Sequence, residues 1–205
     1  MLIRSAALLS ALTLPLFGVA WAQTGRAGAR VIGTNVLTDP PRGPLYWHLD
    51  AYPARAAAET ARDARGTVAE SFGRVWLFTI AEAGWRPTGG ERVATIGPLP
   101  LAAHGRVTAS YLEAATAPGF QTDVHLHAGP EALYTLSGAV CLETPRGKLV
   151  GRAGDEPLLV AGGQPMQLTS IGTETRRSLV LILHDSSQPW KVPADGWRPK
   201  GLCPE

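Results

Sequence analysis

The chain has 205 residues, of which 23 are Gly and 17 are Pro, and its formal net charge at pH 7 is +2. So many turn-forming residues argue against a coiled coil, a helical bundle and a helical repeat array. Lys and Arg form no run, so a phosphate-neutralising surface for nucleic acid is not expected, and the length suits one domain with a core, with or without an appendage.

Residues 1–22 have the pattern of a secretory signal peptide. A cationic residue precedes an uncharged apolar stretch over residues 6–20, and Ala20-Trp21-Ala22 places small residues at the two positions that a signal peptidase reads. The alternative is an uncleaved membrane anchor, but the stretch is short for a span and Pro15 interrupts it. We expect cleavage before Gln23, no stable membrane span afterwards, and a periplasmic or secreted protein.

Residues 23–73 are expected to form a lead-in and a helix. Residues 23–44 are rich in Gly and Pro and have no sustained periodicity, which predicts an extended segment. Residues 53–71 are rich in Ala, begin with Pro53 and carry spaced charges, which favours a helix broken near Gly66. Since it has few large apolar residues, this helix should pack on a core rather than form one.

Residues 74–184 have a pattern of short strands separated by Gly- and Pro-containing turns. The expected strands are residues 74–81, 92–96, 106–115, 123–127, 132–136, 140–144, 148–150, 157–160, 166–169 and 178–184. The last of these is apolar on both faces, as in a strand covered on both sides. This pattern predicts an antiparallel sandwich or barrel, followed by an irregular tail over residues 185–205.

If the chain is exported, its two cysteines, Cys141 and Cys203, are candidates for a disulfide. In an oxidising compartment they could close a disulfide. The alternative is two separate thiols, one beside a strand and one in the tail, because the sequence does not show that the two Cα atoms approach. We favour the disulfide.

Three residues around one turn carry the chemistry of the chain. His125 and His127 are two apart, so on a strand both imidazoles point to the same side of the sheet. Glu131 follows the turn at residues 128–130 and opens the next strand, where its carboxylate can reach back towards both rings. Two His and one carboxylate form a facial set with open metal positions, suited to one divalent Fe, Mn, Ni or Zn ion. The alternative is a surface histidine pair beside a turn.

The spacing around these residues resembles the first motif of the cupin superfamily. That motif is Gly, five residues, His-x-His, three or four residues, Glu, six residues and Gly. The chain has a matching residue at every fixed position: Gly119, His125, His127, Glu131 and Gly138. The resemblance covers roughly Arg106 to His184. It implies an all-β fold, a cupin-type jelly-roll β-barrel that holds one metal ion inside, here with an N-terminal helical extension.

The second motif of that family departs from its usual pattern of Gly, five residues, Pro-x-Gly, two residues, His, three residues and Asn. In the register set by Gly163, Ala161 replaces the Pro, Met166 the His and Ser170 the Asn; one residue earlier, Pro165 takes the His position. Neither register restores the fourth ligand of the family. Met166 is then a thioether ligand, an apolar pocket wall beside a three-ligand metal, or part of a barrel that binds an organic ligand without a tightly held metal.

Three further residues are candidates for contacts with the metal ligands or with a substrate. Gln121 and Asp123 share the alternation of the two histidines, so they can face inward; the alternative is a solvated strand start. His184 ends an apolar strand and reaches the barrel mouth if Val180 and Ile182 face inward. No separate general base is identifiable, so the catalytic residues stay unassigned.

Two functions of different class are compatible with these patterns. The first is an exported metalloenzyme, and the resemblance to cupin dioxygenases implies a dioxygenase-like oxidoreductase that acts on a small organic molecule. The second is a non-catalytic periplasmic module that binds a small molecule or a metal, which the missing His at position 166 favours. Similar proteins commonly form homodimers through sheet edges.

Overall fold

The structure is a computed structural model, and it describes residues 28–38, 43–101 and 105–204. The predicted signal peptide, residues 1–22, therefore lies outside the described residues. Within the described ranges, no helix is long and apolar enough to cross a membrane.

The described residues form one helix and fourteen strands. In chain order these are β1 (Gly28–Leu37), β2 (Tyr46–Tyr52), α1 (Arg55–Ala61), β3 (Gly66–Ser71), β4 (Arg74–Ala81), β5 (Glu91–Ile96), β6 (Val107–Thr116), β7 (His125–Leu126), β8 (Glu131–Ser137), β9 (Ala139–Thr144), β10 (Gly147–Arg152), β11 (Leu158–Val160), β12 (Gln167–Ile171), β13 (Arg176–Asp185) and β14 (Val192–Pro193).

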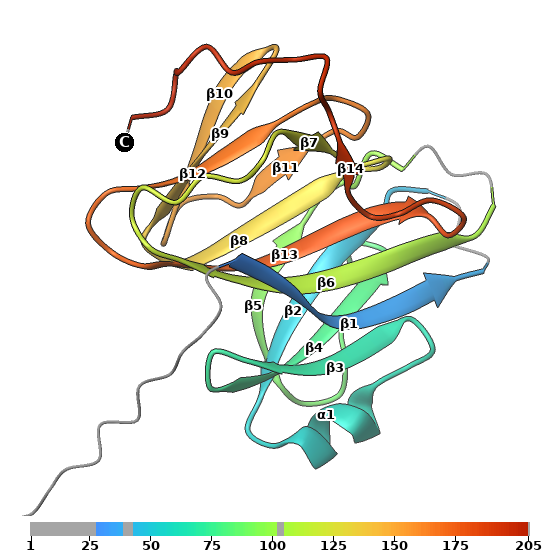
Figure 1. The fold of residues 1–205 in the computed structure, drawn as a ribbon. Helices are drawn as coiled ribbons and strands as arrows, with labels where there is room; N and C mark the ends of the chain where they lie inside the picture. The colour runs from blue at the N-terminus through green and yellow to red at the C-terminus, as the bar shows by residue number, and fades with distance from the viewer. Residues whose placement is uncertain (1–27, 39–42, 102–104, 205) are drawn as a thin grey trace, which may run out of the picture.

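Strands β6 to β13 form a jelly-roll barrel of two facing sheets (Figure 1). One sheet has the order β1-β6-β13-β8-β11, and the other has the order β10-β9-β12. The segment leading into β7 lies beside β12 and the residue before it, through two isolated bridges, Gln121–Thr169 and His125–Met166. All pairings are antiparallel, and the chain crosses from one sheet to the other after every barrel strand except at the β9–β10 hairpin. The predicted all-β jelly-roll architecture is confirmed.

The barrel interior is apolar at its centre. On β13 the side chains of Val180 and Ile182 point inward, because strand residues alternate between faces. They pack with residues of both sheets to form the inner core: Leu112, Ala114, Leu133, Val140, Leu142, Val160, Met166 and Leu168. This core separates the two sheets and leaves room for a site at one end of the barrel.

A further sheet, of order β3-β4-β2-β5 and called the outer sheet below, covers the outer face of the five-stranded sheet. Its aromatic side chains pack on the outward residues of β6 and β13, and Phe78 stacks on Tyr111 with ring centroids 4.9 Å apart. The molecule therefore has three layers of strands (Figure 1). β13 is in the middle layer, so the prediction that residues 178–184 form a strand covered on both faces is confirmed.

The N-terminal region differs from the prediction because strand pairing overrides local propensity. Residues 28–37 of the expected extended lead-in are strand β1, which pairs with β6 along its length. The helix expected over residues 53–71 is limited to α1, whose one buried residue is Ala58. Residues 66–71 pair with β4 as strand β3, and the hydrogen bonds of a ladder outweigh the helix preference of Ala. The N-terminal extension is thus mainly strand.

The C-terminal tail is tied to the barrel at two places. Near its end, Cys203 forms a disulfide with Cys141 of β9, with the two Cα atoms 5.7 Å apart, as the sequence analysis favoured. The backbone N–H groups of Lys200 and Leu202 donate to the Glu143 carboxylate next to it. Nearer β13, the short strand β14 pairs with β7. The second attachment brings the residues just before β14 close to the two histidines.

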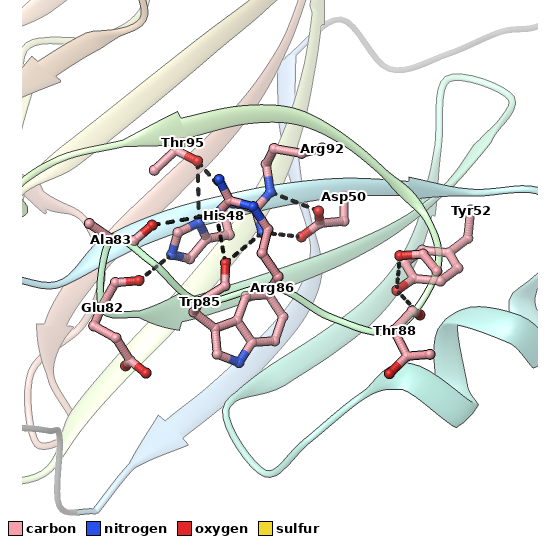
Figure 2. A network of polar contacts seen from close by, with 11 residues as sticks. His48, Asp50, Tyr52, Glu82, Ala83, Trp85, Arg86, Thr88, Arg92 and Thr95 are labelled. Carbon is pink, nitrogen blue, oxygen red and sulfur yellow. Dashed lines mark hydrogen bonds and ion pairs between the residues drawn. The ribbon is translucent and has the colours of Figure 1, made fainter.

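A partly buried polar network links strands of the outer sheet (Figure 2). Arg92 donates to both carboxylate oxygens of Asp50, at 2.7 and 3.2 Å, and to Nδ1 of His48 at 2.6 Å. His48 Nε2–H donates to the carbonyl of Glu82 at 3.0 Å. Since Nδ1 accepts, His48 is neutral, and burial together with the Arg92 charge lowers its pKa from 6.5. The partners of this network all lie in or beside the outer sheet, away from the barrel.

Candidate metal and ligand site

A cavity of about 410 Å³ lies inside the barrel, within the size range of small-molecule sites. Its walls are mostly apolar and come from both sheets and from the segment before β7: Leu112, Ala114, Phe120, Leu168, Val180 and Ile182. Gly28 and Ala29 at the start of β1 and Trp190 and Lys191 of the tail also line it. The titratable residues in its lining are His125, His127, Glu131, Asp123, Arg176 and Lys191.

The two histidine rings are each held by a backbone carbonyl group. The His125 backbone pairs with that of Met166 through two hydrogen bonds of 3.0 and 2.7 Å, and its Nδ1–H donates to the Asp123 carbonyl at 2.7 Å. His127 Nδ1–H donates to the carbonyl of Trp190. A carbonyl oxygen only accepts, so each Nδ1 carries the proton and each Nε2 keeps its lone pair. This is the tautomer in which Nε2 can bind a cation.

Glu131 faces His127 across the cavity. Its position follows from the register of β8, where Glu131 is opposite Ile182 of β13, an inward residue. Its Oε2 atom is 3.6 Å from Nε2 of His127, and both atoms are buried with no hydrogen-bond partner. Burial raises the pKa of Glu131 to about 7 and lowers that of His127 to about 4, so burial pushes both groups towards their uncharged forms.

The chemistry of this pair fits a divalent ion. Two ligands of a tetrahedral ion with bonds of about 2.1 Å lie about 3.4 Å apart, close to the distance between the two unpartnered atoms. The ring of the third predicted ligand, His125, adjoins that of His127, with the two centroids 5.0 Å apart. Among the described residues, no three His, Cys, Asp or Glu side chains are gathered tightly enough to hold a metal ion as they lie. A three-ligand site would therefore require these side chains to rearrange.

The other predicted site residues lie at different depths. Gln121 and Asp123 line the cavity but are exposed at its rim, and Asp123 reaches the site through its backbone carbonyl. Met166 is buried in the inner apolar core and is absent from the cavity lining. His184 lines a separate cavity of about 260 Å³. Its Nδ1–H faces the carbonyls of Asp185 and Gln188, and its Nε2 accepts from Ser110.

Among the cavity residues that the sequence did not predict are Arg176, Trp190 and Lys191. Arg176 is 5% exposed, and its Nε atom is buried without a partner. Burial lowers its pKa to about 10, and the Glu131 charge acts in the opposite direction. The alternation of β13 could have revealed Arg176, since it lies on the same face as Val180 and Ile182. No sequence signal indicates Trp190 and Lys191, which reach the cavity because the tail folds back.

Comparisons with known proteins find similar folds only among solved structures. No protein-family model matches the chain, and no curated protein matches it. A cupin superfamily protein of Desulfitobacterium hafniense is 17% identical, with a TM-score of 0.34 over 38% of this chain and 68% of its own. An uncharacterised Klebsiella pneumoniae protein with a double-stranded β-helix domain is 18% identical, with a TM-score of 0.37 over 42% and 70%.

A third similar structure is an enzyme. The DMSP lyase DddQ of Ruegeria pomeroyi is 17% identical to this chain, with a TM-score of 0.37 over 45% of each chain. The structural neighbours of the chain thus include cupin superfamily proteins and proteins with the double-stranded β-helix fold.

Proposed function

We propose that this chain is an exported cupin that holds one divalent metal ion through His125, His127 and Glu131 and acts as a dioxygenase-like oxidoreductase on a small organic molecule. The observation that carries the proposal is the pair of buried, unpartnered atoms, Nε2 of His127 and Oε2 of Glu131, that face each other in the cavity. Buried polar atoms without partners cost free energy, and a cation between them would remove that cost.

The residues around the pair have definite tasks in this proposal. When bound, the ion supplies a Lewis acid with open coordination positions, and Fe or Mn also supplies redox chemistry. The carbonyls of Asp123 and Trp190 orient the two imidazoles and fix their tautomers. Glu131 releases the proton that burial favours on its carboxyl group when it pairs with the cation. The apolar wall excludes water from the reacting end of a ligand.

Export is part of the proposal and rests on two features. The first is the signal pattern of residues 1–22. The second is the disulfide between Cys141 and Cys203, since such bonds persist in oxidising compartments. The mature protein would then act in the periplasm or outside the cell.

A non-catalytic binding protein is the second candidate function. Two observations favour it. Met166 stands where the cupin pattern has a fourth ligand, with its side chain in the apolar core, and no three potential ligands among the described residues are gathered closely enough to hold an ion. A barrel of this kind could capture a small molecule in its cavity without transforming it.

Metal content of the purified mature protein tests the proposal. We expect a stoichiometric ion in the wild type and its loss in His125→Ala and in Glu131→Gln. His48→Asn is the control, because His48 is a buried histidine of the outer sheet and should keep the metal. A folded wild type without metal, or a content that both site variants leave unchanged, contradicts the site. Oxygen uptake with catechol-like or flavonol-like compounds then separates the enzyme from the binding protein.

A further inference from the structure

Arg176 is a buried cation without a partner in the described part of the chain. Its residue is 5% exposed, its Nε atom has no hydrogen-bond partner, and no ion pair among the described residues includes it. A guanidinium group loses its hydration on burial, and this loss is compensated only when the group is paired or hydrogen-bonded. An anionic ligand would therefore supply the partner that Arg176 lacks.

The direction of Arg176 follows from the strand that carries it. Arg176, Val180 and Ile182 lie on the same face of β13, and all three line the cavity. Arg177, the next residue, faces the other way and is exposed. Glu131 lines the same cavity as Arg176 and influences it electrostatically, yet no hydrogen bond or ion pair joins the two. The guanidinium is therefore free to bind a ligand.

The charges of the cavity favour an anionic ligand. Lys191 is a second cation in the lining, whereas the acidic groups there are Glu131 and Asp123. Glu131 directs its carboxylate at the ring of His127, 3.6 Å away, and not at Arg176, and Asp123 is exposed at the rim. The remaining walls are aliphatic or aromatic. Such a cavity suits a molecule with one anionic group and an apolar body.

We propose that Arg176 binds the carboxylate of a small organic acid whose apolar part lies against Leu112 and Leu168. The planar guanidinium matches a carboxylate in geometry and can donate two parallel hydrogen bonds to it. A small organic acid is then the substrate class of the proposed function, and only the reacting end of the molecule depends on that function. The carboxylate contact itself needs no metal.

Calorimetric titration of the metal-free mature protein tests this contact with three matched pairs of probes: hexanoate and hexanamide, benzoate and benzamide, cinnamate and cinnamamide. We expect at least one carboxylate to bind about tenfold or more tightly than its amide, as a charge-assisted pair of hydrogen bonds predicts. Arg176→Gln should abolish the preference. Arg177→Gln, the exposed neighbour on the same strand, should retain it.

Three results overturn the proposal. They are three carboxylates that bind no better than their amides, a preference that survives in Arg176→Gln, and inorganic phosphate that binds more tightly than every carboxylate. The variant Arg176→Met tests whether a loss of the carboxylate preference comes from misfolding. Because it removes an unpaired buried charge, it should be at least as resistant to urea as the wild type without ligand. A clear loss of resistance would show that Arg176 has a structural partner instead.

The two proposals fail separately. If the mature protein holds no metal but Arg176 still confers the carboxylate preference, the metal site fails and the anion subsite stands. If His125→Ala loses the metal while Arg176→Gln keeps the preference, the metal site stands and the anion subsite fails. Repeating the titrations on the metal-loaded protein shows whether a probe binds the ion instead of Arg176.

Discussion

His48 is a residue whose protonation should affect stability without affecting the cavity. Its pKa is lowered from 6.5 in the folded protein, mainly by burial and then by Arg92, so the unfolded chain binds the proton more readily. The contribution of His48 to the unfolding free energy should therefore be fully present above about pH 6.5, the pKa of the unfolded chain. It should be lost as the pH falls from there towards the pKa of the folded protein. The network in Figure 2 explains why, since a proton on Nδ1 would face the Arg92 guanidinium.

Urea unfolding of the wild type and His48→Gln at about pH 7.5 and about pH 5.5 measures this effect. The wild type should lose more stability between the two pH values than the variant. His125 and His127 also have lowered pKa values, but they are present in both proteins and cancel in the comparison. Equal losses in the two proteins would contradict the prediction.

At the residue scale, the sequence predicts those site residues that lie near one another along the chain. His125, His127 and Glu131 were predicted as a set because they are near neighbours in sequence around one turn, and the structure places all three in the lining of one cavity. Arg176 comes from a strand that is distant in sequence, and the predicted strand began two residues too late to include it. Lys191 reaches the cavity only through the pairing of β14 with β7, which no local pattern encodes.

At the scale of elements, the attachment of the tail to β9 gives a quantitative prediction. The disulfide closes a segment with a sequence separation of 62 residues. In the chain-entropy account, such a loop stabilises the folded state by about 4 kcal/mol. The double variant Cys141→Ala/Cys203→Ala should lose about this much unfolding free energy in a denaturant titration.

The reduced wild type is the matched control for this variant, because it keeps both side chains and lacks only the bond. A loss of similar size in both proteins assigns the effect to the bond. Little change in either would show that the hydrogen bonds of Lys200 and Leu202 to Glu143 hold the tail without the bridge.

The elements that the sequence predicts well are those with strong local patterns. Residues 74–81 match β4 in both bounds, because the apolar run is continuous and β-rich. β1 and β3 were missed for a physical reason. The sequence of β1 contains two Gly and its side chains are mostly half-buried or exposed, and β3 lies in an Ala-rich stretch, so both owe their conformation to pairing with distant strands.

At the scale of the molecule, the five-stranded sheet is the common wall of two cores. Its inner face packs against the β10-β9-β12 sheet, and its outer face packs against β2 and β4 (Figure 1). The two-faced apolar pattern of residues 178–184 predicted that something covers the outer face. It did not identify the cover, because residues 46–52 were given no strand and residues 66–71 were assigned to a helix.

This arrangement predicts that the barrel is not stable without the outer sheet. A chain shortened to residues 105–205 lacks the outer sheet and also β1. It would expose the outward side chains of the common wall: Ala109, Tyr111, Leu179, Leu181 and Leu183, which are at most 1% exposed in the whole protein. An apolar surface of this kind on a sheet causes aggregation. We expect the shortened chain to elute as aggregates in size-exclusion chromatography and to bind an apolar dye, whereas residues 28–205 elute as a discrete species. A monodisperse shortened chain that keeps the near-ultraviolet dichroism of a packed core would contradict this, and would show that the inner core alone supports the cavity.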